Sequence, residues 1–190
     1  MKRFDFDGDS IALDFLNTVS GMRGVESKEN LQSWADLAEW ARQAKLARTA
    51  PHGSQAAYQQ AIAIREALHD VIRAAVEQRD PPAPSLAAVN AWIADALAHR
   101  HLRPAGGGRF TLEFDRDDAP LAFLRPVAAE AADLLQVHLD LVRICGESEV
   151  GRCGWLFLDK TRNHSRRFCS MKDCGNRAKQ RRFQQRKRML

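Results

Sequence analysis

Apolar residues recur every three or four positions through most of residues 1–142, which is the spacing of one face of an α-helix. The pattern predicts helices over residues 10–20, 33–44, 54–77, 85–99 and 120–142. Ser33 with Asp36 resembles a capping box, and Ser85 is expected to cap the fourth helix. Two glycines and mixed charge predict a loop over residues 20–30.

One segment of this region follows a different period. Phe110, Leu112 and Phe114 alternate with polar residues, and the glycines at 106–108 precede them. This alternation predicts a β-hairpin whose turn contains the glycines. Because the glycines come before a strand rather than between a strand and a helix, they are not expected to bind phosphate. The sequence therefore predicts a mainly α body with one small hairpin.

The charge changes sign after residue 142. Residues 1–142 hold 15 Lys and Arg against 20 Asp and Glu, whereas residues 143–190 hold 14 against 4. The net charge of +5 thus combines an acidic body with a strongly basic tail, and the tail alone would attract a polyanion. We place a domain boundary here and expect domains over residues 1–142 and 143–190.

The four cysteines lie in the tail, at Cys145, Cys153, Cys169 and Cys174. The sequence shows neither a membrane span nor a signal peptide, which favours the cytoplasm, where clustered thiols more often bind metal than form disulfides. Four thiolates can close a tetrahedral shell around one structural Zn²⁺; the alternative is four cysteines without a metal.

The tail has the order of elements of a treble-clef zinc finger. The apolar residues 155–158 and Arg167–Phe168 suggest a hairpin between the two cysteine pairs, and a basic helix is expected over residues 176–188. So small and charged a segment cannot fold on apolar burial alone, and metal is expected to supply much of its folding free energy. The predicted fold class is a mainly α domain followed by a treble-clef-like four-cysteine finger that ends in a basic helix.

A cationic helix of this kind suits the major groove of duplex DNA, where arginine reads guanine and other cations hold phosphates. The residues expected to contact DNA are Arg166, Arg167, Asn176, Arg177, Lys179, Arg181, Arg182, Arg186 and Arg188. The alternatives are a solvated basic tail, or a zinc-stabilised adaptor that binds RNA or an acidic protein. A homodimer is expected, because many DNA-binding proteins bind two half-sites as dimers.

The body has one candidate site. Asp14, Asn17 and Thr18 form a polar stripe on the first predicted helix. They either pin a neighbouring loop or face an effector pocket with Trp34, Trp40 and Arg65. We see no nucleophile–base arrangement and no open metal site, so an enzyme is not expected.

These residues resemble two known families. The tail is similar to the CGNR zinc finger through its Cys-Gly-Asn-Arg tetrapeptide at 174–177 and the segments at 153–159 and 165–171. The body is similar to the ABATE domain of stress-induced transcription regulators through residues 13–18 and 37–40. The resemblance implies a bacterial regulator with a helical, ligand-sensing body and a zinc-dependent DNA-binding tail.

Overall fold

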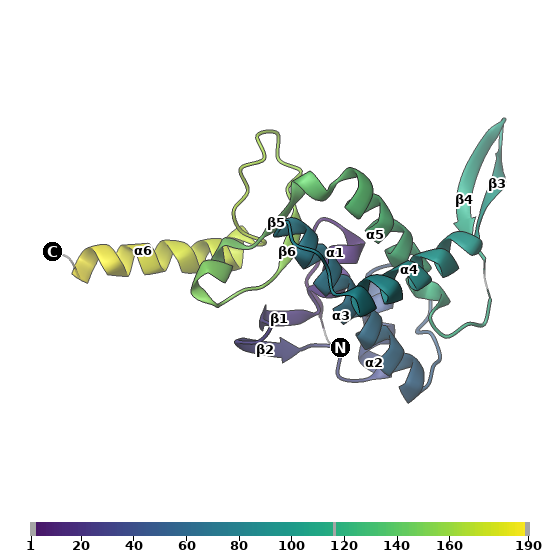
Figure 1. Cartoon of the computed structure of the whole chain (residues 1–190), viewed down its shortest axis with the longest axis horizontal. Helices are drawn as coiled ribbons and strands as arrows, with labels where there is room; N and C mark the ends of the chain where they lie inside the picture. The colour runs from purple at the N-terminus through teal and green to yellow at the C-terminus, as the bar shows by residue number, and fades with distance from the viewer. Residues whose placement is uncertain (1–2, 116, 189–190) are drawn as a thin grey trace. The chain divides into compact units, whose positions relative to one another are not determined.

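The computed structural model describes residues 3–115 and 117–188, and these are mainly helical with small two-stranded sheets (Figure 1). The chain forms two compact units. Unit 1 contains the chain up to Phe4 and Leu31–Leu139, and unit 2 contains Asp5–Asn30 and the chain from Asp140 onward. Among the described residues, no helix is both long and apolar enough to span a bilayer. The predicted fold class is confirmed, although several elements have other limits.

Unit 1 is built from four α-helices within its described residues. They are α2 (Trp34–Gln43), α3 (Gln55–Val76), α4 (Ala83–Ala98) and α5 (Arg125–Val137). Leu68, Val71 and Ile72 of α3 are buried at spacings of one, three and four residues, which places them on one face. That face forms the centre of the unit's core, together with the fully buried Trp40.

Two of these helices begin at the serine that the sequence indicates. The Ser33 hydroxyl accepts a hydrogen bond from the Asp36 N–H at 3.2 Å, and the Asp36 carboxylate accepts one from the Gln32 N–H at 2.8 Å. Ser54 accepts from the Ala57 N–H at 3.2 Å. Both caps satisfy N–H groups that the first helical turn leaves without partners, so α2 and α3 begin as predicted.

The start of α4 differs from the prediction. The helix begins at Ala83, directly after Pro82, so Ser85 lies inside its first turn and does not cap it. The Ser85 hydroxyl instead donates to the Asp70 carboxylate at 2.9 Å. Pro84 is tolerated here because a residue in the first turn needs no partner for its N–H.

The last predicted helix of the body is shorter than its apolar pattern suggests. A 3₁₀ turn (Ala122–Leu124) comes first, α5 begins at Arg125, and the helix ends at Val137. A second 3₁₀ turn (Leu139–Leu141) follows, and residues 142–144 form a strand. The prediction of one helix over residues 120–142 is therefore wrong at both ends.

The predicted hairpin is present as β3 (Arg100–Gly106) and β4 (Arg109–Phe114), which pair antiparallel and extend away from the helices of unit 1 (Figure 1). Leu102 lies opposite Leu112, and the neighbouring Phe110 lies on the same side of the ribbon. These three side chains are 52–66% exposed, so the hairpin presents an apolar face to solvent.

Unit 2 begins with α1 (Ile11–Leu16), and a hairpin of β1 (Val19–Met22) and β2 (Glu26–Glu29) follows. The predicted loop over residues 20–30 is therefore a hairpin. The Thr18 hydroxyl donates to the Phe15 carbonyl at 2.7 Å, where the helix ends. Gly21 has a φ of +80°, and a Cβ there would lie 2.2 Å from the Glu26 carbonyl oxygen, so only glycine fits this crossing.

The C-terminal part of unit 2 forms a second hairpin and a long helix. Its elements are β5 (Val142–Ile144), a 3₁₀ turn (Gly146–Val150), β6 (Leu156–Leu158), a π-helical turn (Met171–Gly175) and α6 (Asn176–Arg188). Strand β6 pairs with β5, not with residues 167–168 as predicted. The β-branched Val142 and Ile144 suit this strand, but a run of three residues is too short to stand out from the helical pattern before it.

Candidate metal centre and nucleic-acid interface

Two chain reversals of unit 2 bring the four cysteines together. Cys145 follows β5 and Cys153 precedes β6, and the Cys145 N–H donates to the Trp155 carbonyl at 2.9 Å. Cys169 and Cys174 lie at the π-helical turn, where the Gly175 N–H donates to the Ser170 carbonyl at 2.9 Å. Each reversal contributes two sulfurs, and the second leads directly into α6.

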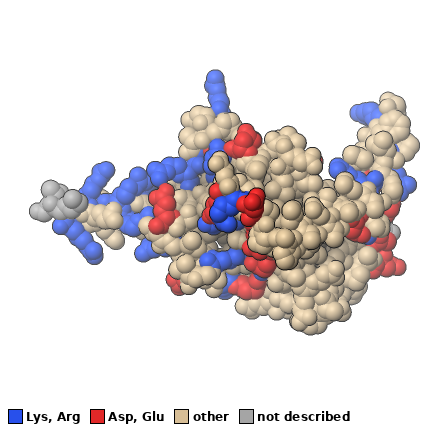
Figure 2. All heavy atoms as spheres, viewed as in Figure 1, with Lys and Arg blue, Asp and Glu red and all other residues tan. Residues whose placement is uncertain are grey.

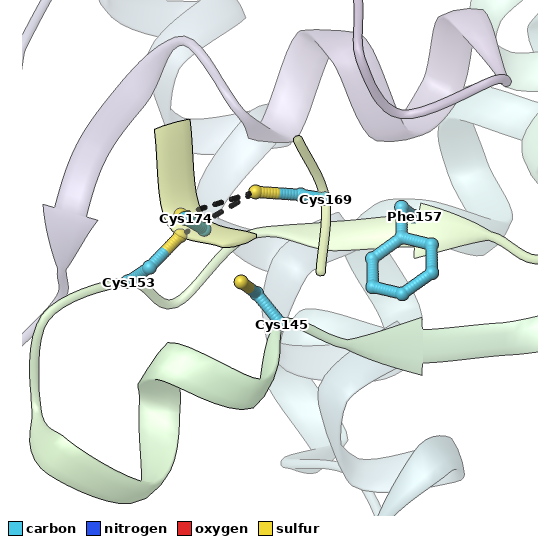
Figure 3. Close-up of a cluster of buried hydrophobic side chains, with 5 residues drawn as sticks. All are labelled: Cys145, Cys153, Phe157, Cys169 and Cys174. Carbon is cyan, nitrogen blue, oxygen red and sulfur yellow. Dashed lines mark hydrogen bonds between the residues drawn. The ribbon is translucent and has the colours of Figure 1, made fainter. Parts of the chain in front are cut away.

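The sulfur atoms are spaced as a tetrahedral zinc site requires. All four Sγ atoms lie within 4.8 Å of one another and point toward a common centre (Figure 3). The Sγ atoms of Cys153 and Cys169 are 3.8 Å apart, and those of Cys169 and Cys174 are 3.7 Å apart. A zinc–sulfur bond of about 2.3 Å places the sulfurs of a tetrahedron about 3.8 Å apart, whereas a disulfide needs about 2.05 Å. The cluster thus fits one structural Zn²⁺.

The charges around the cluster favour a metal ion as well. Hydrogen bonds from the other three thiols lower the pKa of Cys145, while the bond to Cys145 raises the pKa values of Cys153 and Cys169. Four thiolates this close repel each other, so a bound cation would favour their ionisation. Arg177 Nη2 donates to Cys174 Sγ at 3.0 Å, which offsets part of the negative charge that four thiolates carry.

A buried ion pair connects the first cysteine loop to α6. Glu147 lies in the 3₁₀ turn between Cys145 and Cys153 and is fully buried. Its carboxylate accepts two hydrogen bonds from Arg181, from Nη1 at 2.9 Å and from Nη2 at 2.7 Å. Hydrogen bonding to Glu147 raises the pKa of Arg181. A bidentate pair has a fixed geometry, so it fixes the direction in which α6 leaves the metal centre.

The N-terminal segment of unit 2 completes the finger. Asn17 Nδ2 donates to the Leu156 carbonyl at 2.8 Å, and Asn17 Oδ1 accepts from the Leu156 N–H at 3.1 Å, so this side chain replaces a neighbouring strand for β6. Three further bonds join the same two segments: Trp155 Nε1 to the Val19 carbonyl, Gly154 N–H to the Gly21 carbonyl, and Leu158 N–H to the Gly8 carbonyl, at 2.7–2.8 Å. Residues 5–30 therefore supply backbone partners that the tail lacks by itself.

The polar stripe on α1 has structural partners. The Asp14 carboxylate accepts from the Gly8 N–H at 2.8 Å, and Asn17 and Thr18 make the bonds given above. These contacts match the interpretation in which the stripe pins a neighbouring loop. The other predicted pocket residues, Trp34, Trp40 and Arg65, belong to unit 1, where Arg65 pairs with Glu66 at 2.8 Å. An effector pocket at these six positions stays a prediction.

The predicted DNA-contacting residues divide into two groups. Arg166, Arg177 and Arg181 have partners within unit 2, which are the N-terminal segment, Cys174 and Glu147, respectively. The others lie on the exposed surface of unit 2, and they are Arg167, Asn176, which also donates to the Lys172 carbonyl, Lys179, Arg182, Arg186 and Arg188. Figure 2 shows the Lys and Arg side chains gathered along α6.

Two functional residues were not predicted from the sequence. Glu147 and Asp159 are both fully buried, and both hold basic segments of unit 2 in place. A signal for them was present, because the tail contains only four acidic residues among 14 basic ones. An acid retained in so basic a segment is a candidate for an internal partner.

A cavity of about 950 Å³ in unit 2 also has no sequence signal. Residues of the β1–β2 hairpin line one part of it, and Cys153, Cys169 and Cys174 line another. Its walls include Lys28 and Arg177 as well as acidic residues. Segments far apart in the chain form this cavity, so no local pattern could predict it.

Comparison with known families agrees with these features. The ABATE family model, described as "Putative stress-induced transcription regulator", matches residues 9–137, and the CGNR zinc finger model matches residues 142–187. Neither describes an enzyme family. No curated protein matches the chain. With two thirds of its length matched by the first model and its cysteine cluster inside the second, the chain belongs to the ABATE family and carries a C-terminal CGNR zinc finger.

Proposed function

We propose that the chain is a transcription regulator that binds duplex DNA by placing α6 in the major groove. The observation that carries this proposal is the exposed cationic face of α6. Lys179, Arg182 and Arg186 are spaced by three and four residues, so they lie on one face, and all three are exposed. Arg177 and Arg181 lie on another face and are held by the finger itself.

The size and charge of α6 suit a polyanionic groove. The helix has 13 residues, which correspond to about 20 Å, and no acidic residue among them. The major groove is about 12 Å wide and admits one α-helix. Arginine can bind guanine there through two hydrogen bonds, and the remaining cations can neutralise phosphates.

The finger holds this helix at a defined angle. Cys174 lies in the turn that leads into α6, and the Arg181–Glu147 pair holds the second turn of the helix. A helix fixed at its first two turns loses less conformational entropy on binding than a free basic tail does. The fixed start of α6 therefore favours binding to duplex DNA over the alternative of a solvated basic tail.

The test compares two double variants of the full chain. Duplexes are selected from a random pool with the wild-type chain, and the affinity is measured by fluorescence anisotropy at several salt concentrations. Arg182→Ala with Arg186→Ala should weaken binding and reduce the salt slope by about 0.9 for each phosphate that the variant no longer neutralises. The matched control is Arg48→Ala with Arg109→Ala, which removes two exposed cations of unit 1.

Equal affinities of the two double variants would contradict the proposal. Binding that does not depend on duplex sequence, or that prefers RNA, would favour the adaptor alternative instead. Zinc content is measured for each variant, so that release of the metal is not mistaken for removal of a DNA-binding side chain.

Effector binding, a homodimer and a cytoplasmic location belong to the same proposal. Effector binding is what the resemblance to a regulator implies, the homodimer is expected because DNA-binding proteins often pair half-sites, and the location is expected from the sequence. The exposed apolar face of the β3–β4 hairpin supports a test of self-association. Sedimentation of the full chain with and without the selected duplex would reveal a dimer. A monomer at all concentrations would remove the dimer from the proposal.

A further inference from the structure

A basic loop joins β6 to Cys169 and extends from the finger (Figure 1). We define the basic loop as residues 159–168, with the sequence DKTRNHSRRF. It contains four cationic residues, and its one acidic residue, Asp159, is fully buried. Residues 160–165 are all exposed. The loop therefore presents positive charge without a neighbouring surface acid of its own.

Asp159 closes the base of the basic loop. Its carboxylate accepts hydrogen bonds from the Thr161 N–H at 3.0 Å and from the Arg166 N–H at 2.9 Å, so both arms of the loop meet at one side chain. Burial raises the pKa of Asp159, but the hydrogen bonds from Thr161 and Arg166 outweigh it and lower the pKa overall. The His164 N–H donates to the Thr161 carbonyl at 3.1 Å, which makes the tip a tight turn.

Two of the four cationic side chains bind the N-terminal segment of unit 2 and so hold the base of the loop in place. The Arg166 guanidinium lies 4.5 Å from the centre of the Phe157 ring, donates to the Asp7 carbonyl at 2.9 Å and pairs with the Asp9 carboxylate. Lys160 Nζ donates to the Asp9 carbonyl at 2.7 Å. The N-terminal segment thus braces the base, and the tip is held in a defined position.

The two cations of the loop that remain on its surface are Arg162 at the tip, beside the exposed Asn163, and Arg167 on the returning arm. Arginine and asparagine are side chains that proteins use to read the minor groove. We propose that the tip of the basic loop is a second DNA-contacting element, which inserts Arg162 into the minor groove beside the major groove that α6 occupies. This proposal rests on the function proposed above.

The shape of the tip favours the minor groove over the major groove. The minor groove is about 6 Å wide and accepts a single side chain, whereas the wider major groove is filled by a helix or a two-stranded ribbon. A narrow A·T-rich minor groove also concentrates negative potential, which attracts arginine. The basic loop leads directly into Cys169 and the turn into α6 contains Cys174, so both elements adjoin one metal centre.

The experiment uses the zinc-loaded full chain and a duplex of about 30 base pairs, or three helical turns, recovered by selection with the wild-type chain. The base pairs on each side of the selected core are made either G·C or inosine·C. Inosine lacks the guanine amino group that projects into the minor groove and leaves the major-groove edge unchanged. The variants are Arg162→Ala and, as a control for charge, Arg48→Ala in unit 1.

We expect the wild-type chain and Arg48→Ala to bind the inosine·C duplex about fivefold or more tightly than the G·C duplex. Arg162→Ala should lose this difference and bind the inosine·C duplex about tenfold more weakly than the wild-type chain. Equal affinities for the two flanks in the wild-type chain would overturn the proposal. A weaker Arg162→Ala without an inosine effect in the wild-type chain would overturn it too, since Arg162 would then contact only phosphates.

These outcomes are separate from a failure of the proposed function. If α6 does not bind DNA, the wild-type chain selects no duplex, and the double variant of Arg182 and Arg186 resembles its control. If α6 binds DNA and the basic loop does not, selection succeeds and the double variant of Arg182 and Arg186 loses affinity. Arg162→Ala then keeps the affinity of the wild-type chain.

Discussion

Cys174 is the residue at which the metal, the charge and the basic helix meet. Its Sγ lies 3.7 Å from that of Cys169 and accepts a hydrogen bond from Arg177 at 3.0 Å. The next turn begins at Asn176, whose Nδ2 donates to the Lys172 carbonyl at 2.8 Å. Removing this one sulfur would therefore affect both the four-cysteine metal site and the start of α6.

Replacing a cysteine of the second pair should release zinc. A serine hydroxyl does not ionise at neutral pH, so in Cys169→Ser and Cys174→Ser three thiolates must hold the metal. We expect zinc affinity to fall by more than about 100-fold, beyond the range seen when only a ligand's outer hydrogen bond is removed. Zinc content after competition with a chelator measures this. Ser170→Ala, between the two ligands, is the control, and unchanged zinc in both cysteine variants would contradict the assignment.

The cysteines could be predicted from the sequence because they are rare and all lie in one segment. The partners of other residues could not. Asn17 is recognisable as part of a polar stripe, yet its partner Leu156 is 139 positions away. Arg181 belongs to a helical stripe that suits DNA, but Glu147 turns it inward. A pattern shows which residues share a face, and only the fold shows what that face meets.

At the scale of elements, the same limit explains which predictions succeeded. Helices α2, α3 and α6 and the β3–β4 hairpin have long or strictly periodic patterns, and the structure confirms them. The β1–β2 hairpin and the β5 strand have four residues or fewer per strand, and their pairing depends on partners outside the local pattern. Short strands of this kind are set by tertiary contacts more than by propensity.

The Glu147–Arg181 ion pair, which joins the first cysteine loop to α6, can be tested directly. Glu147→Gln removes the charge of a buried carboxylate and leaves Arg181 without its ionic partner. We expect amide hydrogen exchange in α6 to become faster by more than about threefold, which exceeds the effect of an ordinary surface substitution. Hydrogen-exchange mass spectrometry of the zinc-loaded chain measures this.

Glu149→Gln is the matched control for this prediction, because Glu149 lies in the same 3₁₀ turn and is exposed. Exchange in α6 that is equally fast in both variants would mean that the ion pair does not hold the helix. In that case the direction of α6 would depend on the cysteine shell alone.

For the whole molecule, the contacts divide the chain differently from its composition. Charge and the family matches both change near residue 142, whereas the compact units group residues 5–30 with the chain from Asp140 onward. The physical reason is strand β6. One of its edges pairs with β5, and the groups of its other edge find partners in Gly8 and Asn17. A strand with unsatisfied buried backbone groups would be costly, so the finger includes the N-terminal segment.

The finger taken alone should therefore be less stable than its cysteines suggest. A peptide of residues 140–190 keeps all four cysteines but lacks the partners of Gly154, Leu156 and Leu158. We expect it to bind zinc while the amides of β6 exchange at least about tenfold faster than in the full chain, because their N–H groups lose their hydrogen-bond partners and become open to water. A chain that joins residues 5–30 to residues 140–190 through a long Gly/Ser linker should restore the protection. Equal protection in the peptide and the full chain would show that the finger folds independently and that residues 5–30 only rest upon it.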